Sequence, residues 1–265
     1  MATQKPIAKT NAGSIVQATI HQIKLPDLKD VLAKGIDDFM AHPTHLIFLI
    51  AIYPILTFVF AFTAANESML PLVFPLLAGF TLLGPLVASG MYEISRRRER
   101  GEPVSRWHVF AVLKTPAILS LATLGVASLA IYLVWLGAAL SLYTLIFGDA
   151  VPATVGEFAR QVLTTGEGWI LIVAGSAVGL VFAVAALSIS AVSFPLLLDR
   201  DVGAAVAVFI SVRVVVENPI TMAFWGAIVV ASLLVACLPV FTGLAVALPV
   251  LGHATWHLYR KAVEF

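Results

Sequence analysis

Residues 40–65 read MAHPTHLIFLIAIYPILTFVFAFTAA, and this stretch decides the fold class. It places Pro43 in front of a run without Asp, Glu, Lys or Arg that is longer than the roughly 20 apolar residues a bilayer crossing needs. Proline lacks a backbone N–H and has a fixed φ, so it fits the first turn of a helix. The stretch therefore predicts a membrane-spanning helix that begins near Pro43.

The same order of a partly polar stretch, a proline and a long apolar run recurs at Pro116 and Pro219. Hydrophobic residues make up 60% of the chain and charged residues 12%, with a mean hydropathy of +0.98, against about 45–50% and about 25% in soluble domains. We expect an all-α polytopic transmembrane bundle of six spans, arranged as three hairpin repeats that each follow a cytoplasmic interfacial helix. The predicted domain is a single transmembrane unit at residues 26–265 after a flexible tail at 1–25, with spans at about 44–65, 71–95, 117–147, 168–198, 219–238 and 240–259.

The basic residues predict the orientation of these spans. Fifteen of the 16 Lys and Arg residues fall on one side of the six-span arrangement, and only Arg160 falls on the other. Cytoplasmic loops carry the excess of basic residues, so this side and both chain termini are placed in the cytoplasm. We expect a multi-pass protein of a bacterial inner membrane.

The stretch before Pro43 has helical periodicity. Apolar residues recur at helical spacing between Pro26 and Met40, and acidic and basic residues, including Lys29 and Asp38, are assigned to the opposite face. This pattern predicts a helix that lies on the cytoplasmic membrane surface or packs on the bundle.

The densest charge cluster follows the second predicted span. Arg96, Arg97, Arg98 and Arg100, with Trp107 downstream, form a candidate site for anionic lipid or an acidic partner. The alternative is that the cluster only anchors the topology.

Two acidic segments are placed near this cluster. Glu93 lies one turn before the arginines and is expected to pair with Arg96 or Arg97. The turn at residues 199–201, Asp-Arg-Asp, faces the same side and is expected to meet the cluster across the bundle.

Other candidate positions lie inside the spans. Gly175, Gly179 and Ala183 are spaced by four and predict a groove where a neighbouring helix approaches closely. The alternative is that small residues are simply frequent in membrane helices.

Polar residues of the spans suggest two further roles. Ser188, Ser190 and Tyr132 could line a polar pathway, although a serine can equally bond to its own helix backbone. His253 and His257 lie four apart and could hold a metal ion or a haem. An interfacial role as polar tips on apolar side chains is the alternative for these histidines.

Four segments together carry a resemblance: LPDL at 25–28 with GIDDF at 35–39, GPLVASGMYEISRRRERGEP at 84–103, SFPLLLDRDV at 193–202 and LPVLGHATWHLYR at 248–260. They resemble a bacterial family of predicted six-span integral membrane proteins that is classed as a domain of unknown function. The resemblance covers roughly residues 25–262. It implies an inner-membrane location and supplies no catalytic residue.

These patterns favour a non-enzymatic accessory, scaffold or lipid-interacting protein without a cofactor. Its expected partners are membrane phospholipid and other membrane proteins or further copies of the chain, and no nucleic acid. No carboxylate or base lies near the middle of any predicted span, which disfavours a proton-coupled pump or an ion-coupled transporter. A permease for a neutral or amphipathic molecule, and a haem or metal protein, are the alternative functions.

Overall fold

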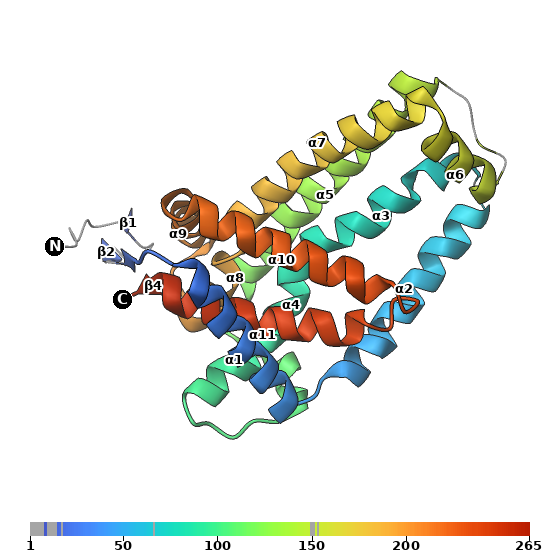
Figure 1. The fold of residues 1–265 in the computed structure, drawn as a ribbon. Helices are drawn as coiled ribbons and strands as arrows, with labels where there is room; N and C mark the ends of the chain where they lie inside the picture. Colours follow the sequence, from blue (N-terminus) through green and yellow to red (C-terminus); the bar gives the residue numbers. More distant parts are fainter. Residues whose placement is uncertain (1–7, 10–14, 17, 66, 149–151, 153) are drawn as a thin grey trace. The chain divides into compact units, whose positions relative to one another are not determined.

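The computed structural model describes residues 8–9, 15–16, 18–65, 67–148, 152 and 154–265. Within these residues the chain is almost entirely helical, as predicted (Figure 1). It divides into two compact units. Unit 1 comprises Met1–Ile50, Gly84–Gly125 and Leu187–Phe265, and unit 2 comprises Ala51–Leu83 and Val126–Ala186.

The helices follow one another along the chain with short connections. In chain order they are α1 (Leu25–Ala41), α2 (His45–Ala65), η1 (Glu67–Leu72), α3 (Val73–Gly79), η2 (Phe80–Leu83), α4 (Gly84–Glu99), η3 (Arg106–Lys114), α5 (Ile118–Phe147), α6 (Val155–Thr164), α7 (Gly166–Ser190), α8 (Ser193–Asp199), α9 (Ala204–Glu217), α10 (Pro219–Cys237) and α11 (Leu244–Ala262), where η marks a 3-10 helix. Two short antiparallel pairs join β1 (Ala8–Lys9) to β2 (Ile15–Val16) and β3 (Thr19–Ile20) to β4 (Val263–Glu264).

Four helical segments of the described residues are long and apolar enough to cross a membrane: Met69–Glu99, Ile118–Phe147, Gly166–Asp199 and Pro219–Cys237. A fifth candidate joins α1 to His45–Val59 across a bend of 96°. These segments fit an all-α membrane bundle. The six-span count and the hairpin repeat stay predictions.

The three prolines lie where helices begin. Pro219 is the first residue of α10, whereas Pro43 and Pro116 precede α2 and α5 by two residues. The residue before a proline is disfavoured in the helical conformation, so each proline also separates its helix from the preceding one.

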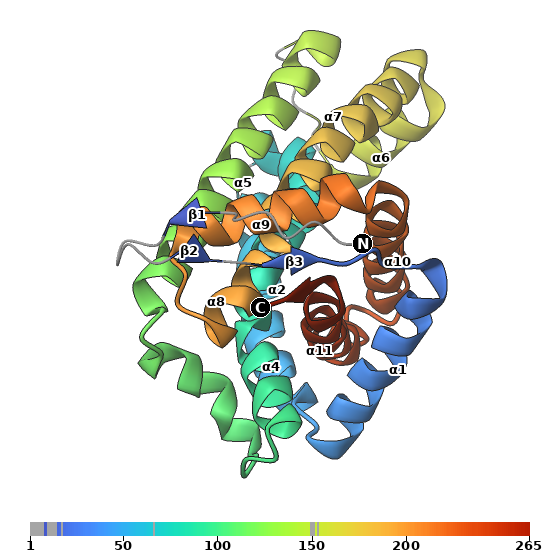
Figure 2. The ribbon, with the colours of Figure 1, turned by 90° about the vertical axis from the view of Figure 1, so that its left-hand side faces the viewer.

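The core of unit 1 forms around α11, which lies between α1 and α4 (Figure 2). Two glycines let these helices approach. A Cβ at Gly35 of α1 would lie 2.7 Å from the backbone N of Ala254, and one at Gly252 would lie 2.9 Å from Cβ of Met91 in α4. Because the neighbours at Gly35 are mostly backbone atoms, only glycine allows this spacing.

Part of the predicted N-terminal tail is held against unit 1. Thr19 pairs with Glu264 and Ile20 with Val263. Ile23 is buried, and its backbone N–H donates to Oδ1 of Asn218 at 2.7 Å. The polar backbone of residues 19–23 is thereby satisfied by β4 and by the start of α10.

Unit 2 has its own smaller core of aromatic residues. Tyr132 and Trp135 of α5 are both 7% exposed and donate hydrogen bonds to the carbonyl oxygens of Leu76 and Pro75. The ring of Trp135 also packs against Phe182 of α7, with centroids 5.6 Å apart. The phenol and indole donors thus bond to carbonyl groups of α3 close to its junction with η2.

α1 carries three stripes rather than the two faces that its sequence predicts. Leu28, Val31, Gly35 and Asp38 are buried, in line with the strong packing of α1 on α11. A polar stripe contains Asp27, Asp30, Lys34 and Asp37, and a second apolar stripe contains Leu25, Leu32 and Ile36 with Lys29 among them. The assignment of Asp38 to the exposed polar face is therefore wrong, because residue 38 falls seven after Val31 and three after Gly35 on the packed side.

Replacing Gly35 with Ala tests the close contact of α1 with α11. The new Cβ would meet backbone atoms, so we expect a loss of about 1–3 kcal/mol in the free energy of unfolding. Gly137→Ala in α5 is the control, because no atom lies within 4 Å of the added Cβ. Thermal unfolding in detergent would measure both, and equal stability of the two variants would contradict the contact.

Candidate functional site

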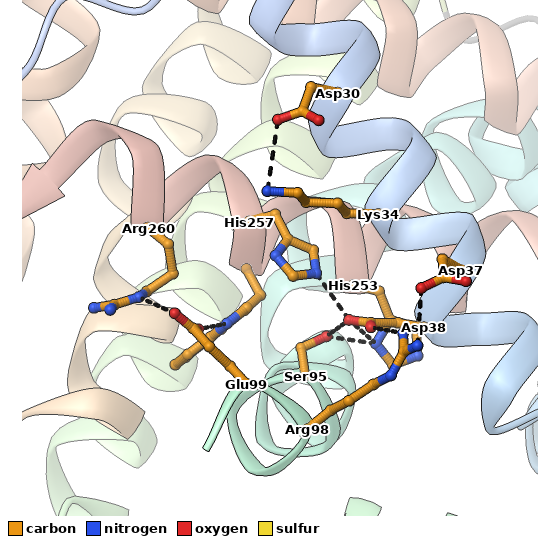
Figure 3. A network of polar contacts seen from close by, with 11 residues as sticks. Asp30, Lys34, Asp37, Asp38, Ser95, Arg98, Glu99, His253, His257 and Arg260 are labelled. Carbon is orange, nitrogen blue, oxygen red and sulfur yellow. Dashed lines mark hydrogen bonds and ion pairs between the residues drawn. The ribbon is translucent and has the colours of Figure 1, made fainter. Parts of the chain in front are cut away.

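A buried carboxylate gathers polar groups from three helices of unit 1 (Figure 3). Asp38 of α1 is 3% exposed. Its Oδ2 accepts hydrogen bonds from Ser95 Oγ of α4 at 2.5 Å and from His257 Nε2 of α11 at 2.9 Å. Its Oδ1 accepts from the guanidinium of Arg98. We call Asp38, Ser95, Arg98, His253 and His257 the Asp38 cluster.

The hydrogen atoms of this cluster are assigned by elimination. Ser95 has one hydroxyl hydrogen, which it donates to Asp38, so His253 Nδ1 must donate to Ser95 Oγ across 2.8 Å. His253 Nε2 is then an unprotonated acceptor, and it is buried with no hydrogen-bond partner in the described part of the chain. Protonation of Nε2 would bury an unpaired charge, so the neutral ring fits this site.

The Asp38 cluster favours an ionised carboxylate. Burial raises the pKa of Asp38, but hydrogen bonds from His257, Ser95 and Arg98 outweigh burial and hold its pKa well below the ordinary 3.8. Since three donors satisfy the charge, the buried Asp38 can tie α1 to α4 and α11.

A second polar group lies nearby on the same helices. Glu99 of α4 accepts hydrogen bonds from Trp256 Nε1 at 2.9 Å and from Arg260 Nε at 3.0 Å. Asp199 at the end of α8 accepts from Tyr259 Oη at 2.8 Å and from Arg100 at 3.0 Å. These bonds fasten α11 to α4 and α8.

The arginine cluster is used within unit 1. Glu93 is 3% exposed and accepts from Arg96 at 2.8 Å and from Arg97 at 2.6 Å, which confirms the predicted pairing. The predicted contact of the 199–201 turn with the cluster is confirmed at Asp199. Of the five residues predicted to bind lipid or a partner, four therefore hold internal carboxylates, and Trp107 stands apart with 63% of its surface exposed.

A cavity of about 360 Å³ opens beside the Asp38 cluster. Its wall is mixed in charge, with residues from α1, α4 and α11: Lys34, Asp37, Arg98, Glu99, Arg260 and Lys261 among them. Each of these four cations already forms an ion pair with a carboxylate of unit 1. The charges of the wall thus connect the helices to one another.

The predicted metal or haem pair lies within this region. His257 Nε2 is bonded to Asp38, and His253 Nδ1 is bonded to Ser95, so neither nitrogen is open to a ligand. No group of three or more His, Cys, Asp or Glu among the described residues has the geometry to hold a metal ion.

The predicted polar pathway and packing groove lie elsewhere. Neither this cavity nor the apolar groove described below is lined by Ser188, Ser190 or Tyr132. A Cβ at Gly179 would lie 3.3 Å from the ring of Trp135, so α7 approaches α5 there.

The other two positions of the packing groove differ from Gly179. Gly175 has only an ordinary contact with Leu142, at 3.7 Å, and Ala183 is exposed. The close approach of α7 to α5 is therefore concentrated at one glycine.

The sequence did not identify Asp38 and Ser95 as site residues. The signal for Asp38 was its spacing from Val31 and Gly35, which places it on the packed face of α1. Ser95 offered no comparable signal, because a serine before an arginine cluster is ordinary. The hydrogen bond between Ser95 and Asp38 joins residues 57 positions apart, so local sequence pattern does not reveal it.

Replacing Asp38 with Asn should destabilise the fold strongly. The neutral amide would remove the buried charge that the Arg98 guanidinium and the His257 donor share, and we expect a loss of roughly 3 kcal/mol. Asp37→Asn is the matched control, since Asp37 contacts the same arginine but its side chain is 72% exposed, and its loss should stay below about 1 kcal/mol. Equal effects in chemical denaturation would contradict the assigned role of Asp38.

The lowered pKa of Asp38 also predicts a pH dependence. The unfolded chain takes up this proton before the folded one, so the stabilisation is complete above the ordinary value of 3.8 and is lost as pH falls through the lower folded pKa. The gap in melting temperature between the wild type and Asp38→Asn should be constant from about pH 7 to 5 and narrow below about pH 4. A gap that widens in acid would contradict the assignment.

The chain was compared with known proteins. A family model described as predicted integral membrane protein (DUF2189) matches residues 73–199, which run from the start of α3 to the end of α8. No curated protein and no solved structure matches. The matched segment contains Ser95 and Arg98, whereas Asp38, His253 and His257 lie outside it. Together with the four apolar helices, the match fits a multi-pass integral membrane protein similar to this family of unknown function.

Proposed function

We propose that this protein is a non-enzymatic component of a bacterial inner membrane, an accessory or scaffold protein whose cytoplasmic face contacts phospholipid. The proposal includes six spans with both termini in the cytoplasm. The observation that carries it is an exposed aromatic ridge with basic ends on η3.

The pairing of β3 with β4 supports an even number of spans. Residues 19–20 and 263–264 are bonded to one another, so they lie on the same side of the membrane. α2 is an apolar helix of 21 residues, long enough to cross. If α2 crosses in addition to the four candidate spans, α11 must cross as well, which gives six.

The polar character of α11 is compatible with a crossing. Most of the helix from Leu251 onward is buried against other helices, so its histidines and its tyrosine face protein instead of lipid. Polar groups inside a membrane are tolerated when they face the bundle interior and have partners, as His257 and Tyr259 do here.

The ridge on η3 is formed by Trp107, Phe110 and Leu113, which are 63%, 50% and 65% exposed. In a 3-10 helix, residues three apart lie directly above one another, so these side chains form one row. The rings of Trp107 and Phe110 stack with centroids 6.3 Å apart. On another side of η3, Val109 is buried and lies against Gly90, which holds the element on α4.

The chemistry of the ridge suits the lipid headgroup region. Arg106 and Lys114 stand at its two ends, and neither forms an ion pair in the described part of the chain. Tryptophan is favoured at headgroup depth, and basic residues attract anionic lipid. Since Arg96, Arg97, Arg98 and Arg100 hold internal carboxylates, η3 is the better candidate for lipid contact.

The pairing of three carboxylates within unit 1 supports a scaffold role. Asp38, Glu93 and Asp199 are each bonded to two or more donors from within unit 1. A catalytic acid or base needs a free face toward a reacting group, whereas Asp38 and Asp199 join helices and Glu93 pairs with arginines of its own helix.

Quenching of tryptophan fluorescence tests the ridge. In phosphatidylcholine vesicles whose lipid is brominated high on the acyl chains, Trp107 should be quenched because its ring lies at headgroup depth. The Trp107→Phe variant should therefore lose a large part of the lipid-quenched emission.

Trp225→Phe is the control, because Trp225 is 2% exposed and its emission should resist the brominated lipid. If Trp107 is instead quenched by aqueous iodide and not by the brominated lipid, the proposed lipid contact is wrong.

A further inference from the structure

The second apolar stripe of α1 lies over a groove against α10. The groove has a volume of about 540 Å³, and its lining is almost wholly apolar: Leu25, Leu32, Ala33 and Ile36 from α1, with Phe224 and Ile228 from α10. Leu25, Ile36 and Phe224 are 45%, 51% and 53% exposed, so the packing within unit 1 leaves the groove open.

We propose that this groove is a binding site for one acyl chain of an anionic phospholipid, with Lys29 contacting the lipid phosphate. This goes beyond general contact with the bilayer, since it assigns a specific lipid position to the chain. It rests on the proposed function only in taking α10 to be a membrane span.

The surroundings of the groove identify its occupant. Phe224 and Ile228 lie about 8 and 14 Å from the first residue of α10, at 1.5 Å per residue, so the groove runs from near one end of this 19-residue helix to its middle. The groove is therefore continuous with the lipid-facing surface of α10, where Val230 and Leu234 are also exposed. An acyl chain is the apolar group that a membrane supplies there.

Lys29 provides the charge complement. It lines the otherwise apolar groove, is exposed, and takes part in none of the ion pairs of the described residues, whereas Lys34 on the polar stripe pairs with Asp30 at 3.6 Å. A lysine stem covers apolar surface while its ammonium reaches the headgroup layer. An unpaired ammonium beside an acyl-chain groove favours a lipid with a negative headgroup.

The expected affinity is modest. An acyl chain that leaves the bilayer for the groove stays in an apolar environment, so the gain comes from packing and from the phosphate contact. One lysine near the membrane surface favours an anionic lipid by about fivefold, the equivalent of about 1 kcal/mol.

Photolabelling tests the site in the full chain. The probe is phosphatidylglycerol with a photoreactive group on one acyl chain, present as a minor component of phosphatidylcholine vesicles, and mass spectrometry locates the labelled peptides. Labelling should concentrate on α1 around Leu32 and Ile36 and on α10 around Phe224 and Ile228. Even labelling along α10, including Val230 and Leu234, would overturn the proposal.

Two pairs of variants sharpen the result. Ala33→Trp fills the groove and should reduce labelling there by about fivefold or more, whereas Ala223→Trp, at an exposed position on another side of α10, should not. Lys29→Ala should remove most of the roughly fivefold preference for phosphatidylglycerol over an equally labelled phosphatidylcholine, and Lys34→Ala should keep it. Unchanged labelling in both Ala33→Trp and Lys29→Ala would overturn the proposal.

The same vesicles separate this inference from the proposed function. Quenching of Trp107 with an unlabelled groove would refute the lipid site and leave the lipid contact of η3 intact. If no lipid probe labels the groove and cross-links form between two chains through α1, the groove is an interface with a second copy of the chain. That result would overturn the lipid site.

Discussion

The fold of unit 1 depends on satisfying the polar groups of α11 inside an apolar protein. Asp38 does this with one carboxylate, because it accepts from Ser95, His257 and Arg98 and so bonds α1 to both α4 and α11. The glycine at position 35 lets α1 come close enough for these bonds to form. Close packing at Gly35 and charge satisfaction at Asp38 are thus parts of one arrangement.

The same arrangement determines which residues are left for lipid. The arginines at and just after the end of α4 are occupied by Glu93, Asp38 and Asp199, so the cations beside exposed apolar side chains are those of η3 and of the second apolar stripe of α1. Both surfaces combine apolar side chains with cations that have no ion-pair partner within the described residues. A rigid end of unit 1 with apolar and basic edges is suited to an accessory protein that works at a membrane surface.

Much of this architecture could be predicted from the sequence. Long uncharged runs and the prolines before them located the long helices, since hydropathy and helix-start chemistry act locally. The spacing of three and four residues along a helix also predicted that Glu93 pairs with Arg96 or Arg97. The Asp38 cluster could not be predicted, because it joins residues far apart in the chain and because Asp38 resembles its acidic neighbours. Lys29 was assigned to a polar face for the same reason, although it lies in the apolar groove.

The six-span arrangement requires that α11 crosses the membrane with its polar side chains buried, and labelling with a membrane-impermeant maleimide tests this most directly. In a Cys237→Ser background, single cysteines would be placed at Val240, before α11, and at Glu264, after it, both of which are exposed. We predict that the two sites label from opposite faces of the membrane, with residue 264 reached from the cytoplasmic face. Labelling of both from the same face would contradict the six-span arrangement.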